Sequence, residues 1–108
     1  MEEHRLHTEK AAAERRLADL RRDFAAVVAA SQDTNADDEH DPEGATIAFE
    51  RSQVAALISQ AEDHLDEIDG ALERLAAGRF GICEGCGQPI PAPRLEARPT
   101  ARRCVGCA

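Results

Sequence analysis

The chain has 108 residues, which suffices for one small domain or for two modules that are each too small to fold alone. Its formal net charge is −8, which argues against a protein that coats nucleic acid or an anionic membrane. It holds three aromatic residues, all Phe, too few for a surface on which bases stack. Composition therefore disfavours most proteins that bind single-stranded nucleic acid.

The longest unbroken apolar run, from Phe24 to Ala30, has seven residues, whereas a bilayer span needs about 20. The opening residues are charged and lack the apolar core of a secretion signal. We therefore expect a cytoplasmic protein with no membrane partner. In that compartment thiols stay reduced, so a cysteine pattern indicates metal binding or catalysis before it indicates disulfides.

Two stretches rich in alanine and charge predict long helices, over about residues 2–32 and 42–77. In each stretch the apolar residues recur at spacings dominated by three and four, which is typical of a helix that packs along one narrow seam. The first seam consists of Leu6, Ala13, Leu17, Leu20, Phe24 and Val27. The second consists of Ile47, Val54, Leu57, Ala61, Leu65, Ile68, Leu72 and Leu75.

The segment between the helices, residues 33–43, holds six acidic residues and no Lys or Arg. Within it, Asp41-Pro42-Glu43 has the order of an N-cap, a first-turn proline and a first-turn acid, so a helix is expected to begin there. A connection this short favours an antiparallel two-helix coiled-coil hairpin with an acidic tip. Periodicity alone also permits two chains to pair through the same seams, so monomer and coiled-coil dimer both remain open.

Glycine, proline and cysteine mark a different C-terminal segment, residues 78–108, and Gly78 is placed to end the second helix. Cys83-x-x-Cys86 and Cys104-x-x-Cys107 are separated by 17 residues, the spacing of a structural zinc site. Four thiolates close the shell around one zinc ion and leave no open position for catalysis. His4 and His7 could reach this site, but four sulfurs leave no need for them. The fold class is therefore mainly α, with residues 1–77 as the hairpin and 78–108 as a zinc finger.

The C-terminal residues carry a specific resemblance. The run from Gly78 to Ile90 includes Phe80-Gly81-Ile82-Cys83, and the stretch between the cysteine pairs includes Arg94-Leu95-Glu96-Ala97-Arg98-Pro99-Thr100. These motifs closely resemble the zinc finger of the DksA/TraR family over about thirty residues. The upstream hairpin agrees with that family in architecture and in its distance from the finger.

The resemblance implies a bacterial transcription regulator that binds RNA polymerase directly, without sequence-specific binding to DNA. In that family the hairpin enters the secondary channel of the polymerase and brings acidic tip residues close to the catalytic magnesium. The matching tip candidates here are Asp41, Glu43, Asp38, Glu39 and Ala45.

The tip departs from the family pattern Asp-x-x-Asp-x-Ala. An ungapped count back from the finger aligns His40, Glu43 and Ala45, whereas alignment on the Asp-Pro pair gives Asp41, Gly44 and Thr46. One acid survives in either register. The alternative interpretation is that the acidic residues only keep the connecting loop solvated.

Arg98 matches the arginine that in some members helps hold guanosine tetraphosphate at the polymerase interface. Those members carry a lysine where this chain has Glu67, and they have a C-terminal helix after the position of Ala108. We therefore expect no cooperation with guanosine tetraphosphate, and Arg98 stays a candidate for the polymerase interface.

Two other functions remain open. Residues 79–108 carry a formal charge of +3, which would suit a DNA-binding finger, but the other 78 residues carry −11 and would repel a phosphate backbone. A coiled-coil adaptor for another protein is the second alternative. No nucleophile and base pair and no phosphate-binding glycine loop is evident, so we expect no enzyme.

Overall fold

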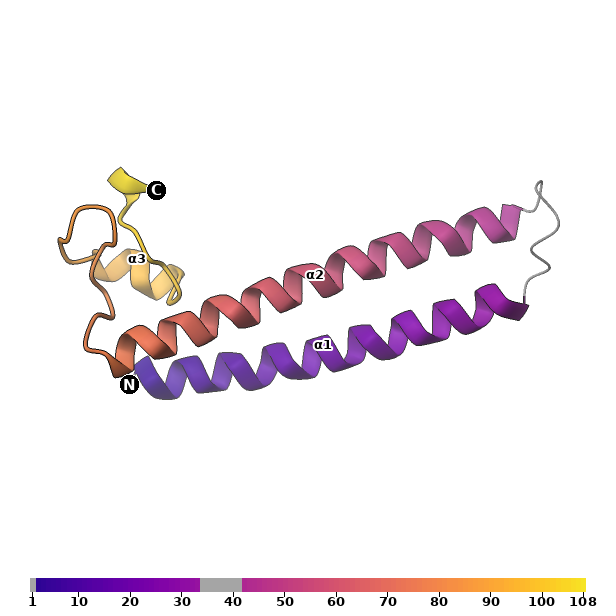
Figure 1. Cartoon of the computed structure of the whole chain (residues 1–108), viewed down its shortest axis with the longest axis horizontal. Coiled ribbons are helices and arrows are strands. Elements are labelled where there is room, and N and C mark those ends of the chain that lie inside the picture. Colours follow the sequence, from indigo (N-terminus) through magenta and orange to yellow (C-terminus); the bar gives the residue numbers. More distant parts are fainter. Residues whose placement is uncertain (1, 34–41) are drawn as a thin grey trace. The chain divides into compact units, whose positions relative to one another are not determined.

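The computed structural model describes residues 2–33 and 42–108, and within these ranges the chain is mainly helical (Figure 1). Two long helices, α1 (Glu2–Asp33) and α2 (Pro42–Ala76), precede a short helix α3 (Ala92–Ala97) and a 3-10 turn η1 (Val105–Cys107). In the described ranges β-pairing is limited to one isolated bridge between Ile82 and Pro89. None of the described helices is long and apolar enough to cross a membrane. The predicted fold class is confirmed.

The chain divides into two compact units. The hairpin unit comprises residues 13–63, and the finger unit joins residues 1–12 to residues 64–108. Each unit contains one segment of α1 and one segment of α2, which pack against each other in antiparallel directions (Figure 1). The predicted division at residues 77 and 78 is a different boundary, and it stays a prediction.

In the hairpin unit, the predicted seam of α1 is the buried one. Ala13, Leu17 and Leu20 of α1 are buried, and Ala61 of α2 is buried with them. Arg21 lies 3.5 Å from Glu62 beside this seam, with both side chains largely exposed. Exposed ion pairs of this kind contribute roughly 0–1 kcal/mol, so apolar burial provides most of the stability.

The prediction for the second seam is wrong at one position. Leu57 is exposed, and its neighbour Ile58 is half-buried instead. With Ile58 in place of Leu57, the inward residues of α2 follow spacings of 7, 4, 3, 4, 3, 4 and 3, the regular alternation of a coiled-coil helix. The predicted seam contains two successive spacings of four, and this irregularity begins at Leu57.

In the finger unit, Leu6 of α1 and Ile68 and Ala71 of α2 are completely buried. Lys10 Nζ lies 2.8 Å from Asp69 Oδ1 across the same pair of helices. This packing fixes the last turns of α2, from which the cysteine-bearing segment continues.

Helix α2 ends at Ala76, just before Gly78, as the sequence predicts. Gly78 has φ +73°, the left-handed conformation that glycine adopts without a steric penalty. The N–H of Arg79 donates to the carbonyl of Arg74 at 2.8 Å and the N–H of Gly78 donates to that of Leu75 at 3.2 Å. These two bonds form a Schellman motif, which satisfies the free carbonyls of the last turn and directs the chain toward the first cysteine pair.

Candidate metal centre

The four cysteines lie together at one point of the finger unit. All four Sγ atoms are within 4.8 Å of one another, and those of Cys86 and Cys104 are 3.9 Å apart. Zinc–sulfur bonds of about 2.3 Å in a tetrahedron place sulfurs about 3.8 Å apart. The cluster therefore fits one tetrahedral metal ion, with two sulfurs from each Cys-x-x-Cys pair.

Backbone N–H groups point at the buried sulfur. Cys83 Sγ accepts from the N–H of Gly85 at 3.3 Å and from that of Cys104 at 3.4 Å. The hydrogen bond from Cys104 is the main reason that the pKa of Cys83 is lowered to about 6, although burial of this thiol acts in the opposite direction. The first pair thus contributes a sulfur whose thiolate form, the form that binds metal, is already stabilised.

Cys107 behaves in the opposite way. Hydrogen bonds with the side chains of Cys104, Cys83 and Cys86 raise the pKa of Cys107 to about 12. Thiol groups this close share protons when no cation lies between them, because adjacent thiolates repel. A metal ion replaces those protons, so metal binding at this cluster is coupled to proton release.

The loop around the first cysteine pair is held by short backbone hydrogen bonds. The N–H of Cys83 donates to the carbonyl of Gln88 at 2.8 Å, and the N–H of Ile90 donates to that of Gly81 at 2.7 Å. A Cβ built on Gly85 would lie 3.0 Å from Cys107 Cβ and 3.1 Å from Cys107 Sγ. Gly85 is therefore required so that the two cysteine pairs approach each other closely.

The second pair is fixed to the first by the backbone. The N–H of Glu84 donates to the carbonyl of Arg102 at 2.9 Å, and the N–H of Cys107 donates to that of Cys104 at 3.1 Å within η1. The first bond ties the end of the connection to the first pair, and the second bond closes the turn of the second pair. The arrangement has the features of a structural site, in which the protein supplies every ligand.

Arg74, which the sequence did not single out, links α2 to the finger. Its side chain is buried, and its Nη2 donates to the carbonyl of Thr100 at 3.2 Å. Burial lowers the pKa of the Arg74 guanidinium, while the carboxylate of Glu84 acts in the opposite direction. Its position three residues after buried Ala71, on the inward face of α2, is the signal that could have found it.

Two further contacts attach the finger to the helices. Thr100 Oγ1 donates to Glu67 Oε2 of α2 at 3.5 Å, and Arg5 Nη2 of α1 donates to the carbonyl of Glu96 at 2.5 Å. The second contact joins residues 91 positions apart in the sequence. The connection between the cysteine pairs therefore rests on the beginning of α1 and on the end of α2.

Arg98, the predicted interface residue, is exposed and lines a hollow of about 330 Å³ in the finger unit. Four arginines and two acidic residues surround this hollow. The arginines are Arg94, Arg98, Arg102 and Arg103, and the acids are Glu67 and Glu84. Glu67, which stands where some family members carry a lysine, lines the same hollow. An acid therefore shares this hollow with Arg98.

The predicted tip residues are only partly described. Asp38, Glu39 and Asp41 lie outside the described residues, which resume at Pro42. Glu43 and Ala45 lie in the first turns of α2, and the side chain of Ala45 is exposed. The beginning of α2 at Pro42 agrees with the predicted helix start, and the tip's contribution stays a prediction.

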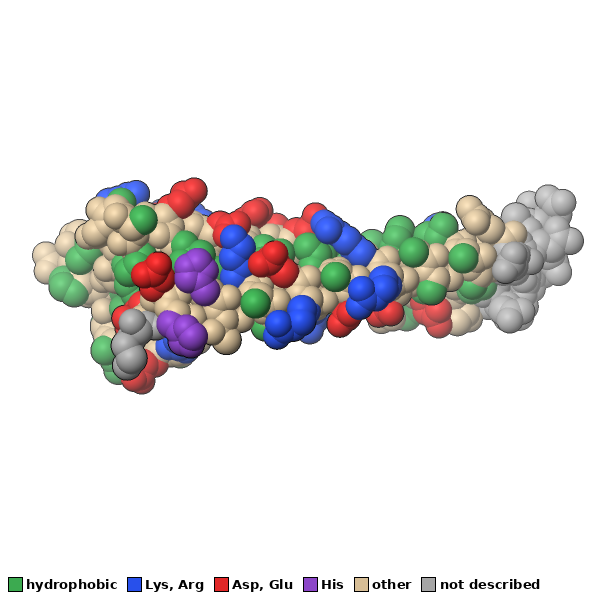
Figure 2. Space-filling model, turned by 90° about the horizontal axis from the view of Figure 1, so that it is seen from below, with side chains coloured by type: hydrophobic (Ala, Val, Ile, Leu, Met, Phe, Trp, Pro, Cys, Tyr) green, Lys and Arg blue, Asp and Glu red, His purple; other side chains and the backbone are tan. Residues whose placement is uncertain are grey.

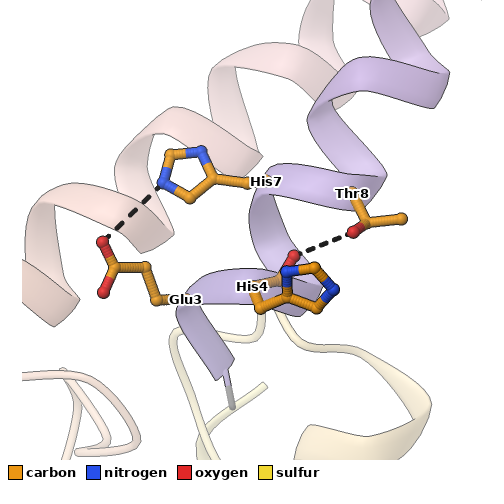
Figure 3. Close-up of polar contacts among 4 residues, drawn as sticks. All are labelled: Glu3, His4, His7 and Thr8. Atoms are coloured by element: carbon orange, nitrogen blue, oxygen red, sulfur yellow. Dashed lines mark hydrogen bonds and ion pairs between the residues drawn. The ribbon is translucent and has the colours of Figure 1, made fainter.

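The two N-terminal histidines make local contacts on α1 (Figure 3). His7 Nε2 lies 3.8 Å from Glu3 Oε1 one turn earlier, and the carbonyl of His4 accepts from Thr8 Oγ1 at 3.0 Å. Both side chains are exposed. In the described ranges, the cysteines are the only group of three or more potential ligand residues that could hold a metal ion. His4 and His7 are thus not part of it.

Four thiols converging from two Cys-x-x-Cys pairs define the C4 class of zinc finger, which binds one zinc ion. Residues 78–108 match the family model described as the prokaryotic dksA/traR C4-type zinc finger. Residues 78–108 are thus a finger of this family, and the resemblance noted in the sequence is confirmed.

Curated relatives extend the match beyond the finger. General stress protein 16O of Bacillus subtilis is 35% identical over 72 residues, which are 67% of this chain and 44% of that protein. The RNA polymerase-binding transcription factor DksA of Haemophilus influenzae is 44% identical over 43 residues, which are 40% of this chain and 30% of that protein. This chain therefore spans less than half the length of these relatives.

A solved structure matches nearly the whole chain. The transcription factor DksA2 of Pseudomonas aeruginosa aligns with a TM-score of 0.57 and 29% sequence identity, covering 96% of this chain and 80% of that one. Both the long helices and the cysteine-bearing segment fall within this alignment. The similarity thus extends to the helices, where sequence motifs are few.

Proposed function

We propose that this protein is a nonenzymatic transcription regulator that binds RNA polymerase directly, with the hairpin inserted in the secondary channel. The observation that carries the proposal is the joint match of finger and helices to DksA-type proteins, which covers 96% of this chain in a solved DksA2 structure. Relatives named as RNA polymerase-binding transcription factors share the same finger. In this proposal Cys83, Cys86, Cys104 and Cys107 hold the structural zinc ion.

The physical basis for channel entry is the narrow cross-section of two paired helices. Each helix is about 10–12 Å wide with its side chains, so a two-helix hairpin can enter where a globular domain cannot. The acidic residues Asp38, Glu39, Asp41 and Glu43 would then lie toward the active centre, next to Ala45. Carboxylates at that place perturb a bound magnesium ion or nearby basic groups electrostatically.

The finger unit has a separate task in this proposal. Arg98 is exposed on the rim of an arginine-lined hollow, which is a suitable surface for an acidic part of the polymerase. Glu67 stands where the family members that use guanosine tetraphosphate carry a lysine, so we expect no cooperation with that nucleotide. We also expect no sequence-specific contact with DNA.

The test is a binding assay with purified bacterial RNA polymerase, repeated in competition with a known secondary-channel factor. We expect saturable binding that the competitor abolishes. Additive binding would contradict the shared channel, and absence of binding would favour an adaptor for another protein. Steeply salt-dependent binding to duplex DNA without polymerase would favour the DNA-binding alternative.

A second arm of the experiment separates binding from action at the tip. The double variant Asp41→Asn with Glu43→Gln should bind polymerase but lose its effect on open-complex lifetime. The matched control is Glu14→Gln, which removes an exposed acid from α1 far from the tip in sequence. Equal effects of the two changes would show that the tip acids only solvate the loop.

A further inference from the structure

One peptide group of the finger unit is held at both of its ends, the group that joins Arg103 to Cys104. Its carbonyl accepts a hydrogen bond from Arg94 Nε at 2.7 Å, and its N–H donates to Cys83 Sγ at 3.4 Å. Two hydrogen bonds in series therefore connect the guanidinium of Arg94 with a cysteine sulfur. The same peptide leads into the second cysteine pair, because Cys104 is itself one of the four clustered thiols.

The backbone of α3 fixes the place from which Arg94 makes this contact. The N–H of Arg94 donates to the carbonyl of Pro91 at 3.0 Å, and the carbonyl of Arg94 accepts from the N–H of Arg98 at 2.7 Å. Figure 2 shows other basic side chains at the surface, where water hydrates them. Arg94 is half-buried, and its Nε is bound to a peptide carbonyl instead. Its guanidinium is thus directed at one particular group.

We propose that Arg94 is a positioning residue of the metal centre, which acts through the peptide between Arg103 and Cys104. The guanidinium is always charged, so its hydrogen bond to the carbonyl is charge-assisted. A cation on the carbonyl oxygen polarises the peptide and makes its N–H a stronger donor, because hydrogen bonds in series strengthen one another. The stronger donor stabilises negative charge on Cys83 Sγ, and a cysteine carries that charge when it binds a metal ion.

The supported hydrogen bond also links the two cysteine pairs. Its donor, the N–H of Cys104, belongs to the second pair, and its acceptor, Cys83 Sγ, belongs to the first. Cys83 Sγ accepts another hydrogen bond from the N–H of Gly85 at 3.3 Å, but that donor lies within the first pair. Loss of the Arg94 side chain should therefore weaken a link between the pairs without removing any metal ligand.

Direction, and not only charge, distinguishes Arg94 from its neighbour Arg103. Arg103 precedes Cys104 directly, but its side chain is exposed and it provides the peptide with the carbonyl alone. If positive charge near the sulfurs were sufficient, the two arginines would contribute equally to metal binding. The proposed role of Arg94 does not depend on the proposed binding to polymerase.

The first test compares Arg94→Met with Arg103→Met in the zinc-loaded full chain. Each variant removes one arginine from the same hollow, but only Arg94→Met removes the donor to the peptide. Arg94→Met should release zinc to a chelating dye about tenfold faster than the unmodified chain, since loss of a group that supports a metal ligand costs about 10–100-fold in affinity. Arg103→Met should release zinc at the unmodified rate. Equal rates for the two variants would overturn the proposal.

The second test separates this role from a general loosening of the finger. Cobalt(II) in place of zinc gives d–d bands that report the tetrahedral geometry and a charge-transfer band that reports the charge on the sulfurs. In Arg94→Met the charge-transfer band should move to longer wavelength while the d–d bands stay unchanged, because a sulfur that loses hydrogen bonding holds its electrons less tightly. Arg94→Lys restores a cationic donor and should recover part of that shift. Altered d–d bands with an unshifted charge-transfer band would give Arg94 a structural role only and overturn the proposal.

A third measurement uses the unmodified chain and so does not require a variant to fold. With an NMR-active cadmium isotope bound in place of zinc, the amide proton of Cys104 should show a scalar coupling to the metal through its hydrogen bond to Cys83 Sγ. The chemical shift of that proton should move upfield in Arg94→Met and stay in place in Arg103→Met. Absence of the coupling at Cys104 in the unmodified chain would overturn the proposal.

Discussion

The finger segment, residues 78–108, and the hairpin unit, residues 13–63, are stabilised in different ways. The hairpin unit buries apolar side chains along a regular seam, with Leu17 and Leu20 at its centre. The finger segment buries few apolar groups, chiefly Ile90 and Ala101, beside the cysteine cluster. In the first region packing determines the fold, whereas in the second the fold depends on a bound ion.

Removal of the zinc ion should have the largest effect. Cys86→Ser, or treatment with a strong chelator, should unfold the finger segment while most of the helical circular dichroism remains, since structural zinc contributes on the order of 10 kcal/mol in small fingers. Zinc content by mass spectrometry and the circular dichroism spectrum measure the two parts separately. Gln88→Ala is the control, because only its backbone takes part in the loop. If helical structure and zinc were lost to the same extent, the two regions would not be stabilised in different ways.

The second change places a charge in the buried seam of the hairpin unit. Leu17→Asp puts a carboxylate into a buried position of the hairpin unit and should lower the free energy of unfolding by about 3–5 kcal/mol. Urea titration followed by circular dichroism measures the loss, and the chain should still bind one zinc ion. Ala18→Asp, at the exposed neighbouring position, should change the stability by much less. Loss of zinc binding in Leu17→Asp would show that the finger needs the hairpin unit.

A smaller effect is expected at the contact between α2 and the finger, where a side chain of the helix holds the metal-binding segment. Arg74→Ala leaves the carbonyl of Thr100 without its donor and should destabilise the finger unit by about 1–3 kcal/mol. The readout is faster transfer of zinc to a chelating dye. Arg79→Ala removes an exposed arginine from the same turn and should leave that rate unchanged. Identical rates for the two variants would mean that the buried guanidinium does not hold the finger.

Sequence reasoning could predict the features that rest on local chemistry. The cysteine spacing predicted the metal cluster, and Gly78 predicted the end of α2, because a helix end and a cysteine pair are each determined by a few adjacent residues. The predicted seam of α1 was also confirmed, because a regular spacing of apolar residues within one helix determines which face is buried. The zinc finger could therefore be inferred from the residue pattern alone.

Features that depend on contacts between distant residues could not be predicted. Leu57 and Ile58 are adjacent and both aliphatic, so residue type does not distinguish them, and packing against α1 turns Ile58 inward. Arginine is a residue type that usually lies at the surface. Arg74 is buried because its side chain reaches the carbonyl of Thr100, 26 residues later. Tertiary packing overrode intrinsic preference at both positions.

The contact between Arg5 and the carbonyl of Glu96 has a consequence for synthesis of the protein. The hairpin unit is continuous in sequence and can fold as soon as residue 63 has left the ribosome, whereas the first turns of α1 must wait for the residues near Glu96. Until residues 64–76 have emerged, Leu6 lacks the buried α2 residues of its own unit, Ile68 and Ala71. A nascent chain stalled before the end of α2 would therefore leave Leu6 and the first turns of α1 without their packing partners.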